Sequence, residues 1–153
     1  MQKPGSTPLG SAERIAALRL ESGRSEVDLA SALGLTGDGF GDLEQYDSEF
    51  ESVLSIEQAS KLATLLGTTM LGLLGEEEPA VKVPIARVRS SLAAHLGSSA
   101  EAREALEDVI DWDLRPFLDG SEAWTSVYTI EFIKKLAAAV EVEWQVVVAG
   151  IGA

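Results

Sequence analysis

Apolar residues recur along the chain at the spacing of amphipathic helices, in short runs that end at glycine. The first run begins at about Ser11 and stops at Ser22-Gly23. Ser25 precedes the second run and, with Asp28 three residues later, has the pattern of a capping box for free backbone amides. Further runs begin after Thr36, after Ser55 and at Thr69. The pattern predicts five short helices up to about Gly75, and therefore a small all-α domain.

The chain also matches itself when it is shifted by 74 residues without a gap. The pairs that this shift creates include Leu18 with Leu92, Gly23 with Gly97, Ser25 with Ser99, Phe40 with Leu114, Leu43 with Phe117, and Lys61-Leu62-Ala63 with Lys135-Leu136-Ala137. Such collinearity indicates two copies of one supersecondary unit. We therefore expect a flexible tail at residues 1–10, a domain at 11–75, an acidic linker at 76–83 and a second, degenerate domain at 84–153.

Several segments of the first copy occur in the order that is typical of one family of DNA-binding proteins. They are Leu18-Arg19, Ser25, Leu29-Ala30, Leu33-Gly34-Leu35-Thr36, Phe40, Leu43-Glu44, Ser55-Ile56 and Leu62-Ala63. In this order they resemble the lambda-repressor-like, XRE-type helix-turn-helix family over roughly Ala12 to Gly75. The resemblance implies an all-α fold of tandem five-helix lambda-repressor-like domains, in which the helix after Thr36 lies in the major groove of DNA.

The charge distribution conflicts with DNA binding. The chain has 12 basic and 25 acidic residues, a net charge of −13. Between Arg24 and Lys61 it runs for 36 residues without a cation, yet this stretch holds nine acids. A protein that binds duplex DNA releases the counterions of the phosphates by placing its own cations there. The stretch that resembles a DNA-binding element therefore lacks the groups that hold DNA.

The residues at individual positions also argue against DNA binding. The positions that face base edges in the family are occupied here by Gly37, Asp38, Gly39, Gly41 and Asp42, and a phosphate-contacting position by Glu26. None of them can make the bidentate contacts by which Arg, Lys, Asn or Gln recognise guanine or adenine. Because glycine destabilises a helix by roughly 1 kcal/mol relative to alanine, we expect this helix to be short, frayed or partly unwound.

The second copy departs further from the family. Its equivalent helix, expected from Asp111 to Leu118, presents Trp112, Asp113 and Arg115 where bases are contacted, and Pro116 lies inside it. Proline in a helix interior removes a backbone hydrogen bond, so this helix should kink or start late. Trp112, Trp124 and Trp144 are expected in the core or at an interface, and an exposed one would suit a protein-binding hot spot. The β-branched run from Trp144 to Val148 allows either a final helix or an edge or oligomer contact.

Other chemistry has little support in the sequence. There are no cysteines, and the single histidine, His95, has no acid paired with it at a fixed spacing, so we expect no catalytic activity. Glu76-Glu77-Glu78 lacks the spacing of a calcium loop, and no phosphate-binding glycine loop is present, so we expect no metal and no cofactor. No apolar run is long enough to span a membrane and no apolar signal region begins the chain, so a cytoplasmic protein is expected.

Two hypotheses remain. The favoured one is a regulator that has lost its basic DNA-contacting face and binds another protein, such as a basic or DNA-binding regulator, as an antirepressor, DNA mimic or mixed oligomer. A homodimer is a further option. The alternative is a conventional sequence-specific DNA-binding regulator. It relies on phosphate contacts from Lys3, Arg14, Arg19 and Arg24, against a charge of −9 over residues 1–78, which hold five basic and fourteen acidic residues.

Overall fold

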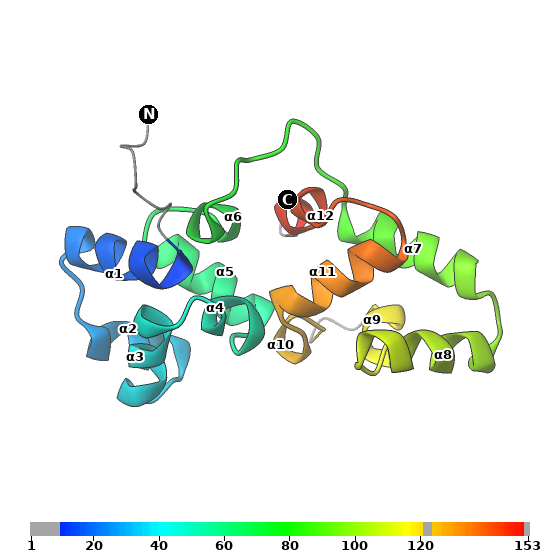
Figure 1. Ribbon diagram of the computed structural model, residues 1–153, viewed down its shortest axis with the longest axis horizontal. Coiled ribbons are helices and arrows are strands. Elements are labelled where there is room, and N and C mark those ends of the chain that lie inside the picture. The colour runs from blue at the N-terminus through cyan, green and yellow to red at the C-terminus, as the bar shows by residue number, and fades with distance from the viewer. Residues whose placement is uncertain (1–9, 121–123, 152–153) are drawn as a thin grey trace, which may run out of the picture. The chain divides into compact units, whose positions relative to one another are not determined.

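The computed structural model describes residues 10–120 and 124–151, and all regular elements in these ranges are α-helices (Figure 1). The all-α fold class is thus confirmed. The helices are α1 (Ser11–Ser22), α2 (Glu26–Leu33), α3 (Gly37–Gln45), α4 (Glu49–Ser52), α5 (Ile56–Leu65), α6 (Met70–Leu74), α7 (Ile85–Leu96), α8 (Ala100–Ile110), α9 (Arg115–Leu118), α10 (Trp124–Val127), α11 (Ile130–Ala139) and α12 (Trp144–Gly150). Nearly all of the tail expected at residues 1–10 lies outside the described residues.

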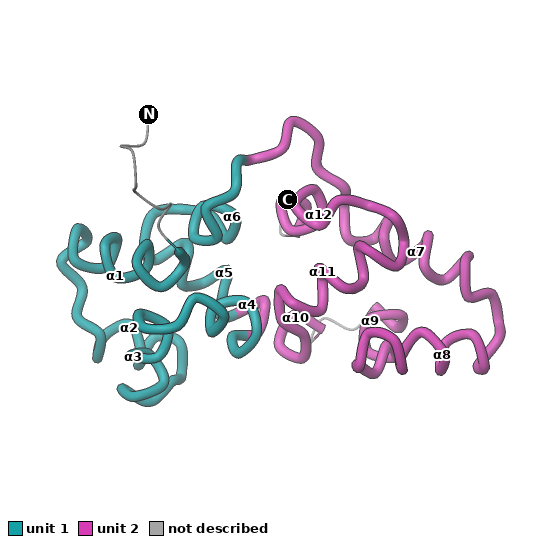
Figure 2. Tube along the Cα trace, viewed as in Figure 1, with its two compact units in different colours: residues 1–54, 58–77 teal, residues 55–57, 78–153 magenta. Residues whose placement is uncertain are grey.

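The chain divides into two compact units (Figure 2). The first comprises Met1–Leu54 and Gln58–Glu77, and the second comprises Ser55–Glu57 and Glu78–Ala153. In the first unit, α1 packs on α3, α4 and α6, and α2 packs on α3. In the second, α11 packs on α8 and α12, and α7 packs on α9 and α12. Each unit therefore has its own helical packing.

The offset of 74 residues seen in the sequence also relates the helices. The bounds of α1 and α7 differ by this offset at both ends, and so do those of α5 and α11. Paired core positions are buried alike: Phe40 with Leu114, Leu43 with Phe117, Ile56 with Ile130, and Leu62 with Leu136 are each at most 1% exposed. Ser25 and Ser99 cap α2 and α8 in the same way: the backbone N–H three residues on donates to the serine hydroxyl oxygen, at 3.1 Å in both units.

Each unit has six helices within the described residues, so the expectation of five was wrong. The additional helices are α4 and α10, each four residues long. A single turn is too short to show a helical period in the sequence, and these turns form around one buried aromatic residue each. Phe50 in α4 is fully buried, and Trp124 in α10 is 7% exposed.

The expectation for α3 was also wrong, because this helix is neither short nor unwound. It runs for nine residues in spite of Gly37, Gly39 and Gly41. The hydroxyl oxygen of Thr36 accepts a bond from the Gly39 N–H at 3.0 Å and caps the helix. Phe40 and Leu43 are at most 1% exposed, and burial of each contributes about 1.5–3 kcal/mol, which together offsets the weak helix propensity of the three glycines.

The corresponding part of the second unit starts late, as Pro116 predicts. Helix α9 begins only at Arg115 and has proline in its first turn. Trp112 and Asp113 therefore precede the helix, and the expectation of a helix from Asp111 was wrong. The run from Trp144 forms helix α12, in which Val147 and Val148 are buried, so an extended edge segment was the wrong alternative.

Candidate functional site

The surface of α2 and α3 is the candidate site in the first unit, because it holds most residues singled out from the sequence. Leu29, Ala30 and Leu33 of α2 and Phe40 and Leu43 of α3 are buried, which fixes the orientation of both helices. Glu26, Asp38 and Asp42 lie on the exposed side, as does Gly37, whereas Gly39 and Gly41 are half-buried. The outward side of this helix pair is therefore acidic.

Three carboxylates on this surface are uncompensated. Among the described residues, the side chains of Asp28, Asp38 and Asp42 have no ion pair or hydrogen bond. A Cβ added at Gly37 or Gly41 would meet no heavy atom within 4 Å, so the backbone of α3 is uncovered beside Asp38 and Asp42. This surface can therefore bind a positively charged group, and a partner can come close to the backbone of α3.

Arg19 is the cation that the structure ties to this surface. Its Nε donates to Glu44 Oε2 at 2.5 Å and its Nη2 donates to Glu44 Oε1 at 3.1 Å, a bidentate pair between α1 and α3. Nη2 also lies 3.5 Å from Glu26 Oε1. The hydrogen bonds to Glu44 raise the pKa of Arg19 above its usual value. With only 14% of its side chain exposed, Arg19 is bound to carboxylates and not presented to a phosphate.

The other cations proposed to contact phosphate do not form an exposed cluster with Arg19. Lys3 lies outside the described residues. The guanidinium of Arg14 lies against Gly75, where a Cβ would collide with it. Arg24 is exposed, and its carbonyl accepts a bond from Arg19 Nη1 at 3.3 Å. Among Arg14, Arg19 and Arg24, only Arg24 is exposed.

Asp47 has a role that the sequence did not reveal. Its Oδ1 accepts a hydrogen bond from the backbone N–H of Ala12 at 3.1 Å and so caps α1 from 35 residues away. Gly10, which precedes this helix, has no side chain to cap it, and a Cβ at Gly10 would collide with the Asp47 carboxylate. The glycine in front of α1 was the available clue.

In the second unit, the segment from Asp111 to Leu114 replaces the first turn of the expected helix. Glu107 Oε2 accepts from the Leu114 N–H at 2.6 Å. The Tyr128 hydroxyl donates to the Asp113 carbonyl at 2.6 Å and accepts from the Phe117 N–H at 3.1 Å. These bonds satisfy the backbone groups that helix formation would otherwise satisfy.

Asp113 and Arg115 form an ion pair at the edge of this segment. Arg115 Nη2 lies 2.8 Å and Arg115 Nε 3.0 Å from the Asp113 carboxylate oxygens. The Arg115 side chain, followed by the Arg115 backbone N–H, lowers the pKa of Asp113 well below its usual value. Burial raises the pKa of Tyr128 to about 12, and the charges of Asp113, Glu107 and Asp119 add to this shift.

The three tryptophans differ in their surroundings. Trp124 is buried and packs edge-on against Phe117, with ring centroids 5.5 Å apart. Trp112 is half-buried and lies edge-on to Phe132 at 5.6 Å. Trp144 is half-buried beneath Lys134, whose Nζ is 4.5 Å from the ring centroid. Trp124 is thus a core residue, whereas Trp112 and Trp144 are partly accessible.

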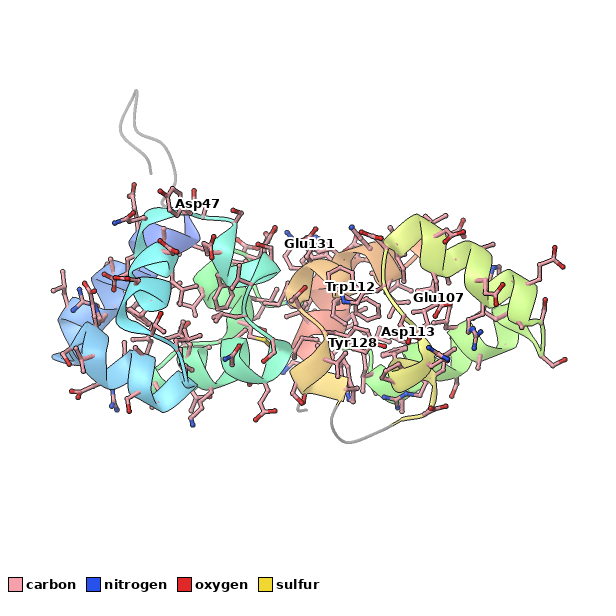
Figure 3. All side chains as sticks on the ribbon, turned by 90° about the horizontal axis from the view of Figure 1, so that it is seen from below. Asp47, Glu107, Trp112, Asp113, Tyr128 and Glu131 are labelled. Atoms are coloured by element: carbon pink, nitrogen blue, oxygen red, sulfur yellow. The ribbon has the colours of Figure 1, made fainter. Side chains whose placement is uncertain are left out.

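Trp112, Asp113 and Arg115, which the sequence placed together, do meet in space. With Glu107 and Asp111 they line an open depression of about 380 Å³. Figure 3 shows Glu107, Trp112 and Asp113 close together, with Tyr128 beside them. Sequence reasoning missed Glu107, because its role depends on the unwound segment folding back over α8.

His95 and the possible metal-ligating side chains are placed as follows. His95 lies exposed in the last turn of α7. Among residues 10–120 and 124–151, no group of three or more His, Cys, Asp or Glu side chains could hold a metal ion. Within the same residues, no helix is long and apolar enough to cross a membrane.

Comparison with protein-family models, with curated proteins and with solved structures found no match in any of the three. The family resemblance therefore rests on the residue pattern of the sequence, and function has to be argued from the two surfaces described above.

Proposed function

We propose that this chain is a regulator of the helix-turn-helix type that acts by binding another protein. In this proposal its two units are degenerate tandem copies of a lambda-repressor-like domain. The α2–α3 surface of the first unit, defined by Glu26, Asp28, Asp38 and Asp42 with Val27, is the contact surface. The partner is a basic protein, such as a DNA-binding regulator, and the chain acts on it as an antirepressor, DNA mimic or mixed-oligomer partner.

The observation that carries the proposal is the pairing of Arg19 with Glu44 and Glu26. A DNA-binding surface needs cations that are free to replace the counterions of phosphates. Arg19 is instead held by two carboxylates at 2.5 and 3.5 Å. The nearby carboxylates of Asp28, Asp38 and Asp42 are exposed and have no cationic partner in the part of the chain that the structure describes, so the surface repels a polyanion.

An exposed apolar side chain on the same helix supports a protein partner. Val27 in α2 is 72% exposed and lies between Glu26 and Asp28 in the sequence. Protein interfaces combine apolar contacts with complementary charges, and charge mainly sets the association rate and the choice of partner. A partner surface with cations around an apolar residue would complement this pattern.

The test is the affinity of the full chain for a fluorescein-labelled DNA duplex at low salt, measured by fluorescence anisotropy. We expect no saturable binding in the micromolar range. Saturable binding that weakens steeply with salt would favour the alternative, a conventional DNA-binding regulator that uses Lys3, Arg14, Arg19 and Arg24. In that case Arg14→Glu with Arg24→Glu would abolish the binding.

A charge-reversal pair makes the test more specific. The double variant Asp38→Lys/Asp42→Lys should acquire salt-dependent duplex binding if the acids of α3 are what prevents it. The variant Glu101→Lys/Asp108→Lys makes the same change in net charge on exposed positions of α8. Equal gains in both variants would mean that net charge alone decides, and would contradict a role for the α2–α3 surface.

A further inference from the structure

A cavity of the second unit lies where α7 ends and α8 begins. Its volume is about 320 Å³. Its lining includes the apolar side chains of Ala93, Leu96 and Leu118, the turn of residues 97–99, and Arg103. Leu96 is buried and Leu118 is half-buried. The cavity therefore has a mainly apolar wall with a cation in it.

Comparison of the two copies explains why this space is open. In the first unit, Arg19 and Glu44 form the bidentate pair described above, with side chains only 14% and 11% exposed, and Glu26 lies beside Arg19. The residues that correspond under the 74-residue offset are Arg19 with Ala93, Glu44 with Leu118, and Glu26 with Ala100. The second unit thus has two alanines and a leucine in place of an ion-paired arginine and two glutamates. Loss of these longer side chains leaves room at the α7–α8 junction.

Arg103 occupies a position that belongs to the core in the first unit. Its counterpart Leu29 is 1% exposed. The Nε atom of Arg103 is buried and has no hydrogen-bond partner within residues 10–120 and 124–151. Glu107 lies 3.6 Å from Nε and Glu104 lies 3.9 Å from Nη2, and both distances are too long for a hydrogen bond. A buried donor without an acceptor is destabilising, so a bound group that supplies an acceptor would be favoured here.

The helix that begins at the cavity favours an anionic acceptor. Helix α8 is 11 residues long, and Ser99 and Ala100 at its start line the cavity. The unpaired N–H groups of a helix N-terminus carry partial positive charge. The cavity volume lies at the lower end of the range of small-molecule sites, roughly 300–1,000 Å³. The guest that fits is therefore a small anion and not a strand of nucleic acid or a protein segment.

We propose that this cavity binds a small organic carboxylate, with its carboxylate at Arg103 and an apolar body against Leu96 and Leu118. A guanidinium and a carboxylate form strong, charge-assisted hydrogen bonds, and the apolar body gains from burial. The bound carboxylate takes the place that the side chain of Glu44 has in the first unit. This inference goes beyond the protein-binding function and does not depend on it, because the cavity shares no residue with the α2–α3 surface.

The experiment titrates the full chain, labelled with ¹⁵N, with phenylacetate at pH 7 and constant ionic strength. The control ligand is phenylacetamide, which has nearly the same shape without the charge. We expect saturable shifts of the backbone amide signals of Gly97 and Ser99, with a dissociation constant on the order of 1 mM. Phenylacetamide should bind about tenfold more weakly. Unmoved signals, or an equal affinity for both ligands, would overturn the proposal.

Two variants with the same change in net charge test the role of Arg103. Arg103→Leu restores the residue type of the first copy, and it should abolish the binding of phenylacetate and raise the melting temperature, because the unpartnered donor is removed. Arg87→Leu removes an exposed arginine of α7 that does not line the cavity, and it should leave the affinity unchanged. Equal weakening in both variants would mean that general charge attracts the ligand, and would contradict a site at Arg103.

A third variant fills the cavity. Ala93→Arg/Leu118→Glu introduces the ion pair of the first copy and keeps the net charge, so it should abolish the binding of phenylacetate while the amide spectrum stays that of a folded protein. Undiminished affinity in this variant would place the ligand elsewhere and overturn the proposal. The titration contains no DNA and does not involve the α2–α3 surface. Its failure therefore leaves the protein-binding function standing, and duplex binding by the chain would refute that function without affecting this site.

Discussion

At the scale of single residues, acids of the first unit have two different uses. Asp28, Asp38 and Asp42 are exposed and have no ion pair or hydrogen bond within residues 10–120 and 124–151, whereas Glu44 and Asp47 hold the fold together. Glu44 fixes Arg19 between α1 and α3, and Asp47 caps α1. All five contribute equally to the net charge, but only the three aspartates of α2 and α3 are available to a partner. Some acids of this unit are therefore exposed and available for binding, and others stabilise the fold.

Comparing the variants Asp47→Ala and Asp42→Ala tests the distinction between acids that stabilise the fold and acids that do not. The substitution leaves the Ala12 N–H without its partner, and loss of a helix cap costs about 1 kcal/mol of unfolding free energy. Urea denaturation followed by circular dichroism measures the change. Asp42→Ala, which removes an exposed and uncompensated acid, should change stability by less than about 0.5 kcal/mol. Equal effects of the two would mean that Asp47 does not cap α1.

Tyr128 has a comparable structural role in the second unit. Its pKa of about 12 lies above the ordinary value of 10.0, so the unfolded chain ionises first. The stabilising contribution of Tyr128 is complete below about pH 10 and is lost as the pH rises through about 12. In an absorbance titration at 295 nm, Tyr128→Phe should remove the late ionisation step. At neutral pH the substitution should also lower the free energy of unfolding by about 1–3 kcal/mol, because the Phe117 N–H and the Asp113 carbonyl lose their partner. A late step that survives in the variant would contradict this role.

At the scale of elements, α3 and the equivalent segment Asp111–Leu118 differ in how much of each is helical. Equivalent apolar residues, Phe40 with Leu114 and Leu43 with Phe117, are buried in both. The first segment forms a helix of nine residues, and the second forms one of four after an unwound stretch. Proline at position 116 accounts for the late start, and Glu107 and Tyr128 satisfy the backbone groups that the missing turn leaves free. The same core positions therefore support two different outer surfaces.

Glycine substitutions test how α3 depends on its local sequence. Gly41→Ala adds a methyl group into open space within the helix and should stabilise the protein by about 0.5–1 kcal/mol. Gly34→Ala places a side chain at φ +73° and should destabilise it by about 1 kcal/mol. Thermal unfolding of both variants measures the two changes. A destabilising effect of Gly41→Ala would show that the space beside α3 is filled.

At the scale of the whole molecule, the net charge of −13 dominates. Like charges repel in the folded chain, and dissolved salt screens this repulsion more than it weakens the few ion pairs. We therefore expect the melting temperature to rise by a few degrees between low salt and about 0.3 M NaCl, where the Debye length is below about 8 Å. Differential scanning calorimetry measures the shift. A melting temperature that falls with salt would mean that ion pairs such as Arg19 with Glu44 outweigh the repulsion.

The sequence by itself determined the features that depend on local spacing or composition. Helix starts follow from capping residues such as Ser25 and Thr36, the matching bounds of α1 with α7 and of α5 with α11 follow from the 74-residue offset, and the acid surplus follows from counting. The late start of α9 follows from one proline. Each of these properties depends only on the identity and order of the residues, so it can be recognised without knowledge of tertiary contacts.

Only the tertiary structure decided which charges are free. Arg19 meets Glu44 across 25 residues, Asp47 reaches Ala12 across 35, and Tyr128 bonds Asp113 across 15. The nine-residue length of α3 depends likewise on the burial of Phe40 and Leu43, which outweighs the glycines. Such pairings arise when packed helices bring distant side chains within hydrogen-bond reach, and side-chain spacing along the chain does not encode that distance.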